Sequence, residues 1–457
     1  RQHFRAIFCD PALESSRLLR TEEDLKNPIK QTEVHAAAKR LNNGRALGPD
    51  GIPAKLIKYG TPALFSNIAT TFNNYAKDKS LKLGDGLLIP IPKPGKKRGP
   101  PGNVRPVTLL NTLRKLLSLV ILTRIKPAIN GYLSLNQSGF RSGRSTGDVV
   151  YSYRWLSARC QRVASEISIL GIDMSKAFDT ISRVRLIDIL STVIDHDELH
   201  IIQCLLTDTT IKVKLNNILS QPLVTHNGTP QGDSLSPVLF TVYLEAALRL
   251  IRERLSPRPA LDIQLQLPNE TAYADDVDFI STSLQYLHDN QPILSSSLAE
   301  YNLKMNEAKT EYTTIKREKD RVDERWRNTV KLGSMLGVEE DISRRKRLAT
   351  CALHQLWVIW LRGNHAREPL RIRLYSSFIL PILLYNCGTW SLTETQEKKL
   401  DSFHRQQLRA VIGVKYPRII RNEALYKRTG SKPLSRIIQS ARWRMFGHML
   451  RLDTSSP

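Results

Sequence analysis

The stretch TAYADDVDFIS, residues 271–281, places two adjacent carboxylates between two short apolar runs. Its flanks have the composition of β-strands, and Asp tolerates the tight geometry of a turn, so the pattern predicts a hairpin with Asp275 and Asp276 at its tip. A third acid, Asp278, lies among the apolar residues that follow. Most isolated acid pairs of this kind are solvated turns. A metal site is the alternative, and it would need a third carboxylate from elsewhere in the chain.

A third carboxylate follows the run Ile167 to Ile172, which is nearly continuous in apolar residues and typical of a buried strand. Asp173 comes directly after it, either as the N-cap of a following helix or as an acid at a sheet edge. If the strand lies beside the hairpin, Asp173 meets Asp275 and Asp276, and three carboxylates in one place repel one another unless a divalent cation lies among them. Ligands that are all oxygen favour Mg2+, with Mn2+ as an alternative, over zinc.

The charge of the chain indicates what such a site would act on. The 457 residues contain 68 Lys and Arg against 43 Asp and Glu, a net charge of +25, which favours contact with nucleic acid or an anionic membrane. No apolar run is long enough to span a bilayer and no signal peptide is recognisable, so the membrane is the weaker alternative. Carboxylate-bound metal ions in a basic protein fit phosphoryl transfer on nucleic acid.

The positive charge is concentrated in the last quarter of the chain. Residues 341–457 contain 22 Lys and Arg against 7 Asp and Glu, a net charge of +15. A solvated basic surface is one interpretation. The interleaved aromatic residues favour a folded helical region with a side that faces phosphates. These aromatic residues are Trp357, Trp360, Tyr375, Trp390, Tyr416 and Trp443.

The cysteines are few and widely spaced, with no CxxC pair, so we expect a reducing compartment and no structural zinc. In CALH, residues 351–354, the spacing allows two metal ligands, but no second pair exists, and we expect Cys351 to be a buried side chain. The first residue is Arg, so we expect a fragment or a processed product. The five cysteines are Cys9, Cys160, Cys204, Cys351 and Cys387.

Along the chain, residues 1–80 are expected to be mostly helical, with a Gly/Pro-punctuated loop from Gly44 to Pro53. A short strand, Leu87 to Ile91, should precede a basic loop rich in Pro and Gly. The period-two alternation in IKVKLNNILS predicts a second hairpin that turns at Asn216 and Asn217. From about residue 340 onward the pattern is helical.

Two loops could contact phosphates or bases. The segment PIPKPGKKRGPPGNVRPV follows the strand at 87–91 and is either a solvated basic loop or a lid that clamps phosphates. The Gly-rich segment GTPQGDSLSP, residues 228–237, is either a simple turn or a place where the backbone approaches a base or sugar closely. The cations of the first loop are Lys93, Lys96, Lys97, Arg98 and Arg105.

Six blocks, in chain order NVRPVTLL, QSGFRSGRST, GIDMSKAFD, GTPQGDSLSP, YADD and LKMNEAKTE, resemble the ordered blocks of a reverse transcriptase of the non-LTR, LINE-type retrotransposons. GRALGPDGIPAKLIK resembles their extra N-terminal block and KLGSMLG their primer grip. PILLYNCGTW and ARWRMFGHMLR are similar to the helical tail of a subset. The resemblance covers nearly the whole chain. It implies an α+β right-handed polymerase with an antiparallel palm sheet: a helical N-terminal extension at 1–80, fingers and palm at 81–335, and a helical thumb with a basic C-terminal region at 336–457.

The resemblance assigns roles to residues that match the family's motifs. Asp173, Asp275 and Asp276 match the catalytic acids that bind Mg2+ or Mn2+. Phe178 matches the steric gate, whose ring crowds a ribose 2′-hydroxyl. A competing interpretation makes Phe178 a plain core residue.

Further matches concern the nucleotide. Lys93 and Arg105 match the positions that hold the incoming triphosphate, and Gln231 matches the glutamine near template and nucleotide. Lys309 matches the lysine proposed to protonate the leaving pyrophosphate. One departure is Asp233, where an apolar or small residue is usual after the Gly, which puts local template contacts in question.

The implied activity is RNA-directed DNA polymerase: dNTPs are added to a DNA 3′ end, on an RNA template, with a nicked genomic target as the expected primer. The family resemblance also implies an intracellular ribonucleoprotein, in nucleus and cytoplasm, and an endonuclease domain on the full-length polypeptide or in trans. One rival is a catalytically inactive, RNA-binding descendant, which the intact acids do not favour. The other is a viral RNA-dependent RNA polymerase, which would carry Gly-Asp-Asp at the hairpin and a polar residue in place of Phe178.

Overall fold

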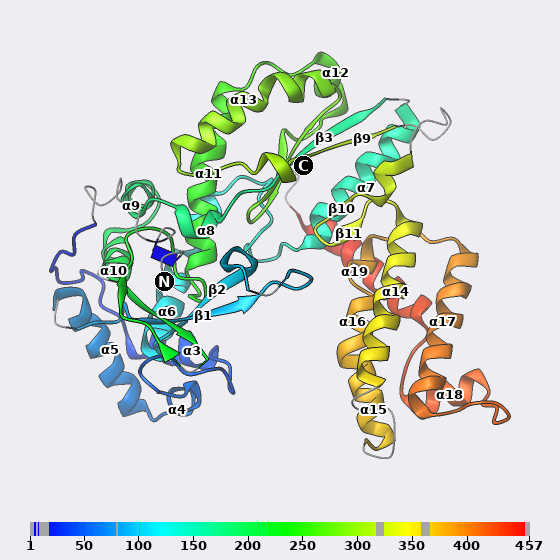
Figure 1. The fold of residues 1–457 in the computed structure, drawn as a ribbon, viewed down its shortest axis with the longest axis horizontal. Helices are drawn as coiled ribbons and strands as arrows, with labels where there is room; N and C mark the ends of the chain where they lie inside the picture. Colours follow the sequence, from blue (N-terminus) through cyan, green and yellow to red (C-terminus); the bar gives the residue numbers. More distant parts are fainter. Residues whose placement is uncertain are drawn as a thin grey trace.

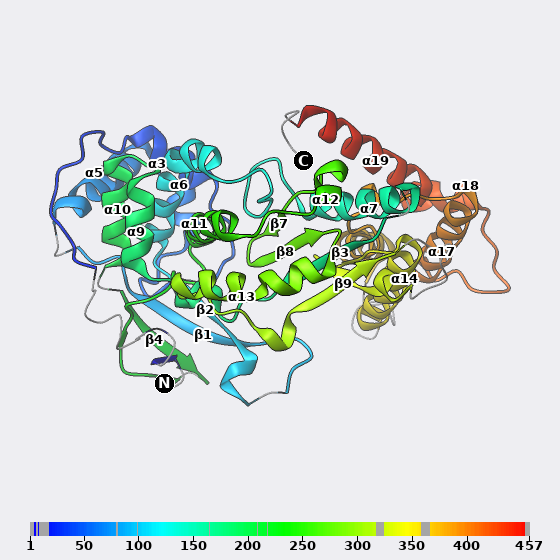
Figure 2. The same ribbon diagram turned by 90° about the horizontal axis from the view of Figure 1, so that it is seen from above.

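The computed structural model describes residues 4, 5, 8, 18–78, 81–97, 99–163, 165–207, 209–216, 218–316, 324–357 and 366–452. Helices from the N-terminal part and helices from the C-terminal part lie at opposite ends of the long axis, with a four-stranded sheet between them (Figures 1 and 2). The sequence therefore correctly predicted a mixed fold of helices and strands. Within the described part of the chain, no helix is both long and apolar enough to cross a membrane.

The four-stranded sheet has the order β7-β8-β3-β9, and all its neighbouring strands are antiparallel. Every residue of its inner strand β3 is buried. One face, with Ile167 and Ile169, packs in a core shared with helix α7, and the other, with Leu170 and Ile172, packs in a core shared with α13. Burial on both faces explains the nearly continuous apolar run. The bounds are β3 Ile167–Ile172, β7 Glu270–Tyr273, β8 Asp276–Ser281, β9 Glu311–Ile315, α7 Thr146–Val163 and α13 Leu284–Glu300.

A second sheet contains the basic loop and the second predicted hairpin. Strands β1 and β2 form a long antiparallel hairpin, whereas β1 and β4 are parallel. The hairpin expected around Asn216 is confirmed by the antiparallel pairing of β4 with β5; Asn217 lies outside the described residues. The bounds are β1 Gly86–Pro92, β2 Val104–Leu110, β4 Thr210–Leu215, β5 Ile218–Leu219 and β6 Leu223–Val224, with a 3-10 turn η1 at Pro101–Asn103.

Helices of the first 260 residues pack into the largest hydrophobic core, which also takes in one face of the four-stranded sheet. The helix–loop–helix pattern expected before residue 80 is confirmed by α3, α4 and α5. Pro237 lies in the first turn of helix α11, the position that its fixed φ favours. The bounds are α3 Gln31–Lys39, α4 Ala54–Lys58, α5 Pro62–Lys77, α6 Thr112–Tyr132, α8 Ala177–Thr180, α9 Arg183–Ser191, α10 His196–Leu206, α11 Ser236–Arg254 and α12 Ala260–Leu265.

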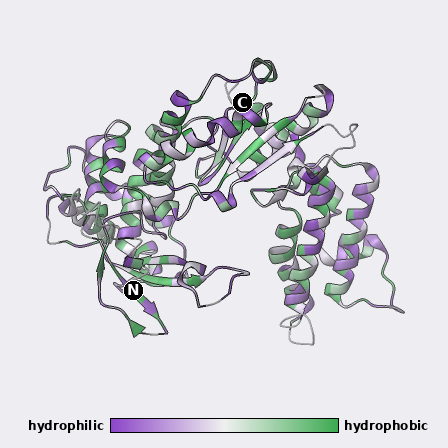
Figure 3. Ribbon diagram, turned by 45° about the horizontal axis from the view of Figure 1, so that its top comes forward, coloured by the Kyte–Doolittle hydropathy of each residue, from purple (hydrophilic) through white to green (hydrophobic). Residues whose placement is uncertain are grey.

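The C-terminal part is helical, as predicted, and has its own hydrophobic core. Hydrophobic and hydrophilic residues alternate along its helices, as expected where one face of each is buried (Figure 3). The short elements that precede this helical part in the chain are η2 Glu307–Lys309, η4 Glu324–Asn328, β10 Val330–Lys331 and β11 Ser334–Met335. Its own bounds are α14 Val338–Leu356, α15 Glu368–Leu374, the π-helical η6 Tyr375–Ile379, α16 Leu380–Leu383, η7 Cys387–Thr389, α17 Glu394–Ile412, α18 Asn422–Thr429 and α19 Leu434–Arg451.

One expectation about this region needs correction. Cys351 is exposed, not buried, because α14 faces the core with other residues, among them Ala349 and Leu353. The aromatic residues of this region are divided between core and surface: Tyr375 and Trp390 are core residues, each 1% exposed. Tyr416 and Trp443 remain on the surface, Trp357 packs against the core as a partly buried residue, and Trp360 lies outside the described residues.

Candidate active site

The two acids of the YADD motif lie at the tip of the β7–β8 hairpin, which confirms the predicted turn. Tyr273 pairs with Asp276, so Ala274 and Asp275 form the two-residue loop. Ala274 has a positive φ of 60°, which such tight hairpin turns require. Asp276 is the first residue of β8 and is exposed, whereas Asp275 is half-buried.

Asp173 joins these acids because β3 lies beside β8. Ile172 is opposite Val277 in the antiparallel pairing, and one further step along both strands sets Asp173 opposite Asp276. The interpretation of Asp173 as a helix N-cap is wrong, because α8 begins later and Lys176 is its N-cap. The strand end therefore brings Asp173 to the sheet edge that holds the acid pair.

The electrostatics are those of crowded carboxylates. Reduced hydration raises the pKa of Asp276 to about 6, with further contributions from the negative charges of Asp275, Asp278 and Asp173. The pKa of Asp275 is also raised, first by burial and then by the charge of Asp173, against the opposing effect of Lys309. Repulsion of this kind is relieved by a cation.

Lys309 supplies a cation in this structure. Its Nζ lies 2.8 Å from Oδ2 of Asp173, and the amide Nδ2 of Asn306 donates to the same oxygen at 3.3 Å. The backbone N–H of Asn306 also donates to the carbonyl of Asp173 at 2.8 Å. Lys309 therefore contacts Asp173, one of the acids that were predicted to share an active site with it.

The acids fit a hard divalent cation by the chemistry of their donors, which are carboxylate oxygens without sulfur or imidazole. Their raised pKa values are the second observation in favour, because a bound cation would stabilise the charged forms. Among the described residues, however, no three His, Cys, Asp or Glu side chains are already gathered as a metal site requires. Binding of a metal ion would therefore need side-chain movements that bring the carboxylates together.

Asp278, the third acid of the motif, has a different environment. Its Oδ1 lies 2.6 Å from Nζ of Lys331, and Oδ2 accepts a hydrogen bond from the hydroxyl of Tyr153. Gly171 makes room for this pair, because a Cβ there would lie 2.5 Å from Nζ of Lys331. Lys331 belongs to KLGSMLG, so the pair joins the β10–β11 hairpin to the sheet. Nothing in the local sequence predicted this contact.

The remaining predicted residues share a cleft with the acids. The described residues that line a cavity of about 680 Å3 come mainly from the β1–β2 hairpin, the segment after β3, the GTPQG loop with the start of α11, the YADD turn and the segment of Asn306 and Lys309. Every candidate site residue except Asp276 lines it: Lys93, Arg105, Asp173, Phe178, Gln231, Asp275 and Lys309.

Phe178 lies on α8 and is partly buried. Its ring packs on the buried ring of Phe240, with 4.3 Å between centroids and an angle of 31° between planes. The ring therefore touches the core as well as the cleft, so both interpretations of Phe178 have structural support.

Gln231 is held from two sides. Its amide Nε2 donates to both carboxylate oxygens of Asp179, at 2.8 and 3.0 Å, and its backbone carbonyl accepts from the N–H of Thr108 at 2.7 Å. Gly232 is required here: it has a φ of 130°, and a Cβ would lie 2.4 Å from the carbonyl oxygen of Thr108. Asp179 is 3% exposed, and burial raises its pKa to about 6. Sequence reasoning missed Asp179, although it directly follows Phe178.

Asp233, the departure noted in the sequence, is a structural residue. Its Oδ2 lies 3.1 Å from Nε of Arg114, and these side chains are 3% and 1% exposed. Arg114 also donates to the carbonyl of Leu205 at 2.8 Å. The carboxylate of Asp233 is therefore neutralised internally.

Lys93 and Arg105 are on opposite arms of the β1–β2 hairpin. Arg105 pairs with Ile91 and is exposed, and the Nζ of Lys93 donates to the carbonyl of Gly102 at 3.1 Å. Lys96 and Lys97 are exposed on the connecting loop, while Arg98 lies outside the described residues.

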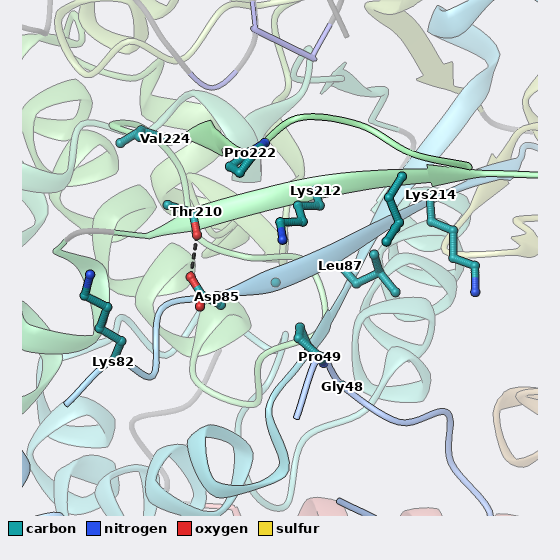
Figure 4. Close-up of a pocket in the computed structure, with 12 residues that line it drawn as sticks. Gly48, Pro49, Lys82, Asp85, Leu87, Thr210, Lys212, Lys214, Pro222 and Val224 are labelled. Atoms are coloured by element: carbon teal, nitrogen blue, oxygen red, sulfur yellow. Dashed lines mark hydrogen bonds between the residues drawn. The ribbon is translucent and has the colours of Figure 1, made fainter. Parts of the chain in front are cut away.

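A second cavity, of about 810 Å3, lies on the second sheet near the loop at Gly48 and Pro49 (Figure 4). Its cations are Lys82, Lys212 and Lys214; the last two come from β4. Among the described residues that line it, the one acid is Asp85, which accepts a hydrogen bond from the hydroxyl of Thr210.

Comparison with known proteins places these features in a family. The profile of the family described as reverse transcriptase (RNA-dependent DNA polymerase) matches residues 91–339. Among curated proteins, the chain is 28% identical over 272 residues to the "Transposon TX1 uncharacterized 149 kDa protein" of Xenopus laevis, which covers 58% of this chain and 20% of that protein.

Two relatives from Drosophila melanogaster have more informative names. The "Probable RNA-directed DNA polymerase from transposon BS" is 26% identical over 62% of this chain and 31% of its own length. The corresponding protein "from transposon X-element" is 22% identical over 88% of this chain and 45% of its own length. The chain thus spans less than half the length of each of these relatives.

Proposed function

Because this chain belongs to the reverse transcriptase (RNA-dependent DNA polymerase) family, we propose that it copies RNA into DNA as the polymerase of a non-LTR retrotransposon. The observation that carries the proposal is that Asp173, Asp275 and Asp276 lie at one edge of an antiparallel sheet. In this assignment the four-stranded sheet is the palm, the β1–β2 hairpin belongs to the fingers, and the helices from α14 onward form the thumb and a basic C-terminal region.

The three acids would hold Mg2+, or Mn2+. When bound, two such ions would activate the 3′-hydroxyl of a DNA primer and stabilise charge on the leaving pyrophosphate. The proposed reaction joins that hydroxyl oxygen to the α-phosphorus of a dNTP and breaks the bond to pyrophosphate. Lys309 lies in the same cleft, where its ammonium can give a proton to the leaving group.

The other cleft residues would bind the nucleotide. Lys93 and Arg105 offer positive charge to the triphosphate from the β1–β2 hairpin, and the fork of the guanidinium suits phosphate oxygens. Phe178 would occupy the space next to C2′ of the sugar, which favours deoxyribonucleotides over ribonucleotides.

The template would be RNA, and the primer a DNA 3′ end at a nicked target. The lysine-lined cavity supports a path for the template strand, because Lys82, Lys212 and Lys214 are gathered where a phosphate backbone could follow the sheet. An endonuclease on the full-length polypeptide or in trans would supply the nick. The protein would work as an intracellular ribonucleoprotein in nucleus and cytoplasm.

The test is primer extension by the purified chain on poly(rA)/oligo(dT) with dTTP and Mg2+. Extension by the wild type and its loss in Asp275→Asn, which replaces a carboxylate by a near-isosteric amide, are the expected results. Circular dichroism and melting of the variant should match the wild type. Equal extension by both proteins would remove the acids from the chemistry, and no extension by a folded wild type would favour an inactive, RNA-binding descendant.

A further inference from the structure

A cavity of about 540 Å3 lies outside the catalytic cleft, where helix α19 packs against η7. The described residues that line it are Tyr151 of α7, residues 388–391 and one side of α19, and none of them lines the cleft. Figure 2 shows α19 at the top of the view and the β1–β2 hairpin at the bottom. A ligand in this cavity would therefore contact none of the residues assigned to the polymerase reaction.

The walls of this cavity are held in place by contacts within the protein. Gly388 lets η7 approach α19, because a Cβ there would lie 3.0 Å from the carbonyl oxygen of Ala441. Arg154 of α7 donates to the hydroxyl of Thr389 and lies 3.0 Å from the carboxylate of Asp341. Both sides of η7 are thus fastened, so the cavity is formed without a ligand and binding would order few groups.

The open side of the cavity is aromatic. Trp443 is 65% exposed and Phe446 is 54% exposed, although both have large apolar rings. Their ring centroids are 5.9 Å apart and their planes are nearly perpendicular, at 79°. A flat group that stacks on one of these rings would present its edge to the other, and both arrangements are favourable for aromatic systems.

The charge around this aromatic corner is positive. Helix α19 contains no Asp or Glu, and Arg442, next to Trp443, lines the cavity. Among the described residues that line the cavity, none is acidic. Aromatic rings next to arginines are the combination with which proteins bind single-stranded nucleic acid: bases stack on the rings and cations contact the backbone. Bases within a duplex have their faces covered, so only an unpaired base could stack here.

We propose that this cavity binds an unpaired base of a single-stranded nucleic acid, stacked on Trp443 with its edge toward Phe446 and with Arg442 at an adjacent phosphate. Gln439 lines the same cavity, and its amide offers both a donor and an acceptor to a base edge. Stacking tolerates every base, so little sequence preference is expected. The inference goes beyond the proposed polymerase function and requires binding only.

A second cavity continues the surface along α7. Its volume is about 480 Å3, it shares Tyr151 with the first cavity, and Trp155, which is 46% exposed, also lines it. Asp148 is the one acid among its described lining residues, and the carboxylate of Asp148 already contacts His448 at 2.9 Å. Neighbouring nucleotides of the same strand would therefore find a further aromatic ring without an unpaired negative charge beside it.

The experiment measures binding of labelled oligo(U) to the whole chain by fluorescence anisotropy. Trp443→Ala should raise the Kd by about tenfold, within the range for stacking of one base. Trp443→Phe keeps a ring and should recover most of the affinity. The slope of log affinity against log salt should not change in Trp443→Ala, because stacking neutralises no phosphate. Affinity for a duplex of the same length should stay at the wild-type value.

The matched control is Phe378→Ala on η6, because Phe378 is 58% exposed, much like Phe446. Phe378→Ala should leave the Kd for oligo(U) unchanged, and all variants should keep the wild-type melting temperature. A second measurement locates the base directly. Oligo(U) that carries iodouracil is irradiated in the complex, and mass spectrometry should find the crosslink on Trp443 or Phe446.

The source of the strand is distinguished by repeating the titration with oligo(dT). Tighter binding of RNA would assign the cavity to the template, and tighter binding of DNA would assign it to the target. Either result supports the inference if Trp443→Ala weakens that binding.

Two outcomes would overturn the inference. One is an unchanged Kd in Trp443→Ala together with no crosslink to α19, which would leave this aromatic corner to another occupant, such as a protein segment. The other is an equal loss of duplex and single-strand binding, which would indicate a general effect on the fold. A wild type that binds oligo(U) through Trp443 but does not extend primers would remove the proposed function and leave this inference standing.

Discussion

At the scale of single residues, the charged form of Asp276 lowers the stability of the fold. The pKa of Asp276 is raised from a reference of 3.8 to about 6, first by reduced hydration and then by Asp275, Asp278 and Asp173. A raised carboxyl pKa means that this group favours folding below pH 3.8 and that the contribution is lost as pH rises through 6. A site that binds a cation is expected to show such repulsion between its carboxylates when no cation is bound.

Asp276→Asn should therefore melt at a higher temperature than the wild type at pH 7, by about a degree or two because solvent screens this exposed carboxylate, while losing DNA synthesis. The difference should shrink as pH falls from 6 toward 4, where the wild-type carboxyl becomes protonated. Thermal melts at four pH values without divalent cations would measure it. A difference that is absent at pH 7, or that grows at low pH, would contradict the assigned electrostatics.

Phe178 should decide which sugar is used, because its ring lies in the cleft one residue before Asp179. Phe178→Val leaves room for a 2′-hydroxyl, so GTP incorporation should rise much more than dGTP incorporation falls. The ratio of the two efficiencies is the measurement. The competing role in the core, supported by the contact with Phe240, predicts that both activities fall alike and stability drops by about 3 kcal/mol. Phe240→Leu is the matched control for that core effect.

Some of these residues could be predicted from the sequence and some could not. Asp275 and Asp276 are marked by a turn between apolar runs, and Asp173 by the end of a buried strand, which are local signals. Asp179 and Lys331 were missed because their partners lie far away in the chain: Gln231 is 52 positions from the first, and Asp278 is 53 from the second. Contacts between residues so far apart in the chain produce no periodic pattern in the sequence.

At the scale of elements, strands with strong local patterns were predicted well and their pairing was not. The bounds of β3 and the hairpin turn at Asp275 agree with the sequence, because burial on two faces and turn chemistry are local properties. The parallel pairing of β1 with β4 joins segments more than 100 residues apart. The lysine-lined cavity lies where these two strands pair, so no local sequence pattern predicted it.

Lys212→Ala with Lys214→Ala tests whether this cavity holds the template strand. These side chains come from one face of β4 and line the cavity (Figure 4). Affinity for single-stranded RNA should fall, and the slope of log affinity against log salt should flatten by about 0.7 for every phosphate that is no longer neutralised. Lys55→Ala with Lys77→Ala, on α4 and α5, removes equal charge outside the cavity and should change the slope little. Equal slopes for the two double variants would exclude a template path here.

At the scale of the whole molecule, a buried acid is among the contacts that join the basic C-terminal part to helix α7 and to the β10–β11 hairpin. Asp341 is fully buried and accepts from Arg154 of α7 at 3.0 Å, from the indole Nε1 of Trp390 at 3.0 Å and from the backbone N–H of Met335 at 3.0 Å. A chain cut near residue 341 should bind nucleic acid more weakly and with a flatter salt slope. It would also leave Arg154 buried without its carboxylate, so a sharper variant is needed.

Helix α19 offers that variant. Its 18 residues contain no Asp or Glu, and Arg442 and Arg444 are exposed on either side of Trp443, which is 65% exposed. The helix packs on η7 and α17 and comes near α7 (Figure 2), where His448 contacts Asp148 at 2.9 Å, so its exposed arginines can be replaced without touching that contact. Arg442→Gln with Arg444→Gln should leave the melting temperature unchanged and weaken binding to a primer–template.

The slope of log affinity against log salt separates a direct contact from a general effect of charge. Removing an arginine that neutralises a phosphate should reduce the slope by roughly 0.7 to 0.9, so removing two changes it by about 1.6, whereas a distant charge changes affinity slightly at low salt only. Lys398→Gln with Lys399→Gln on α17 removes the same charge, with Lys398 already paired to Glu394 at 2.6 Å. If both double variants keep the wild-type slope, the +15 of the C-terminal part is a solvated surface, and the nucleic acid lies along other elements.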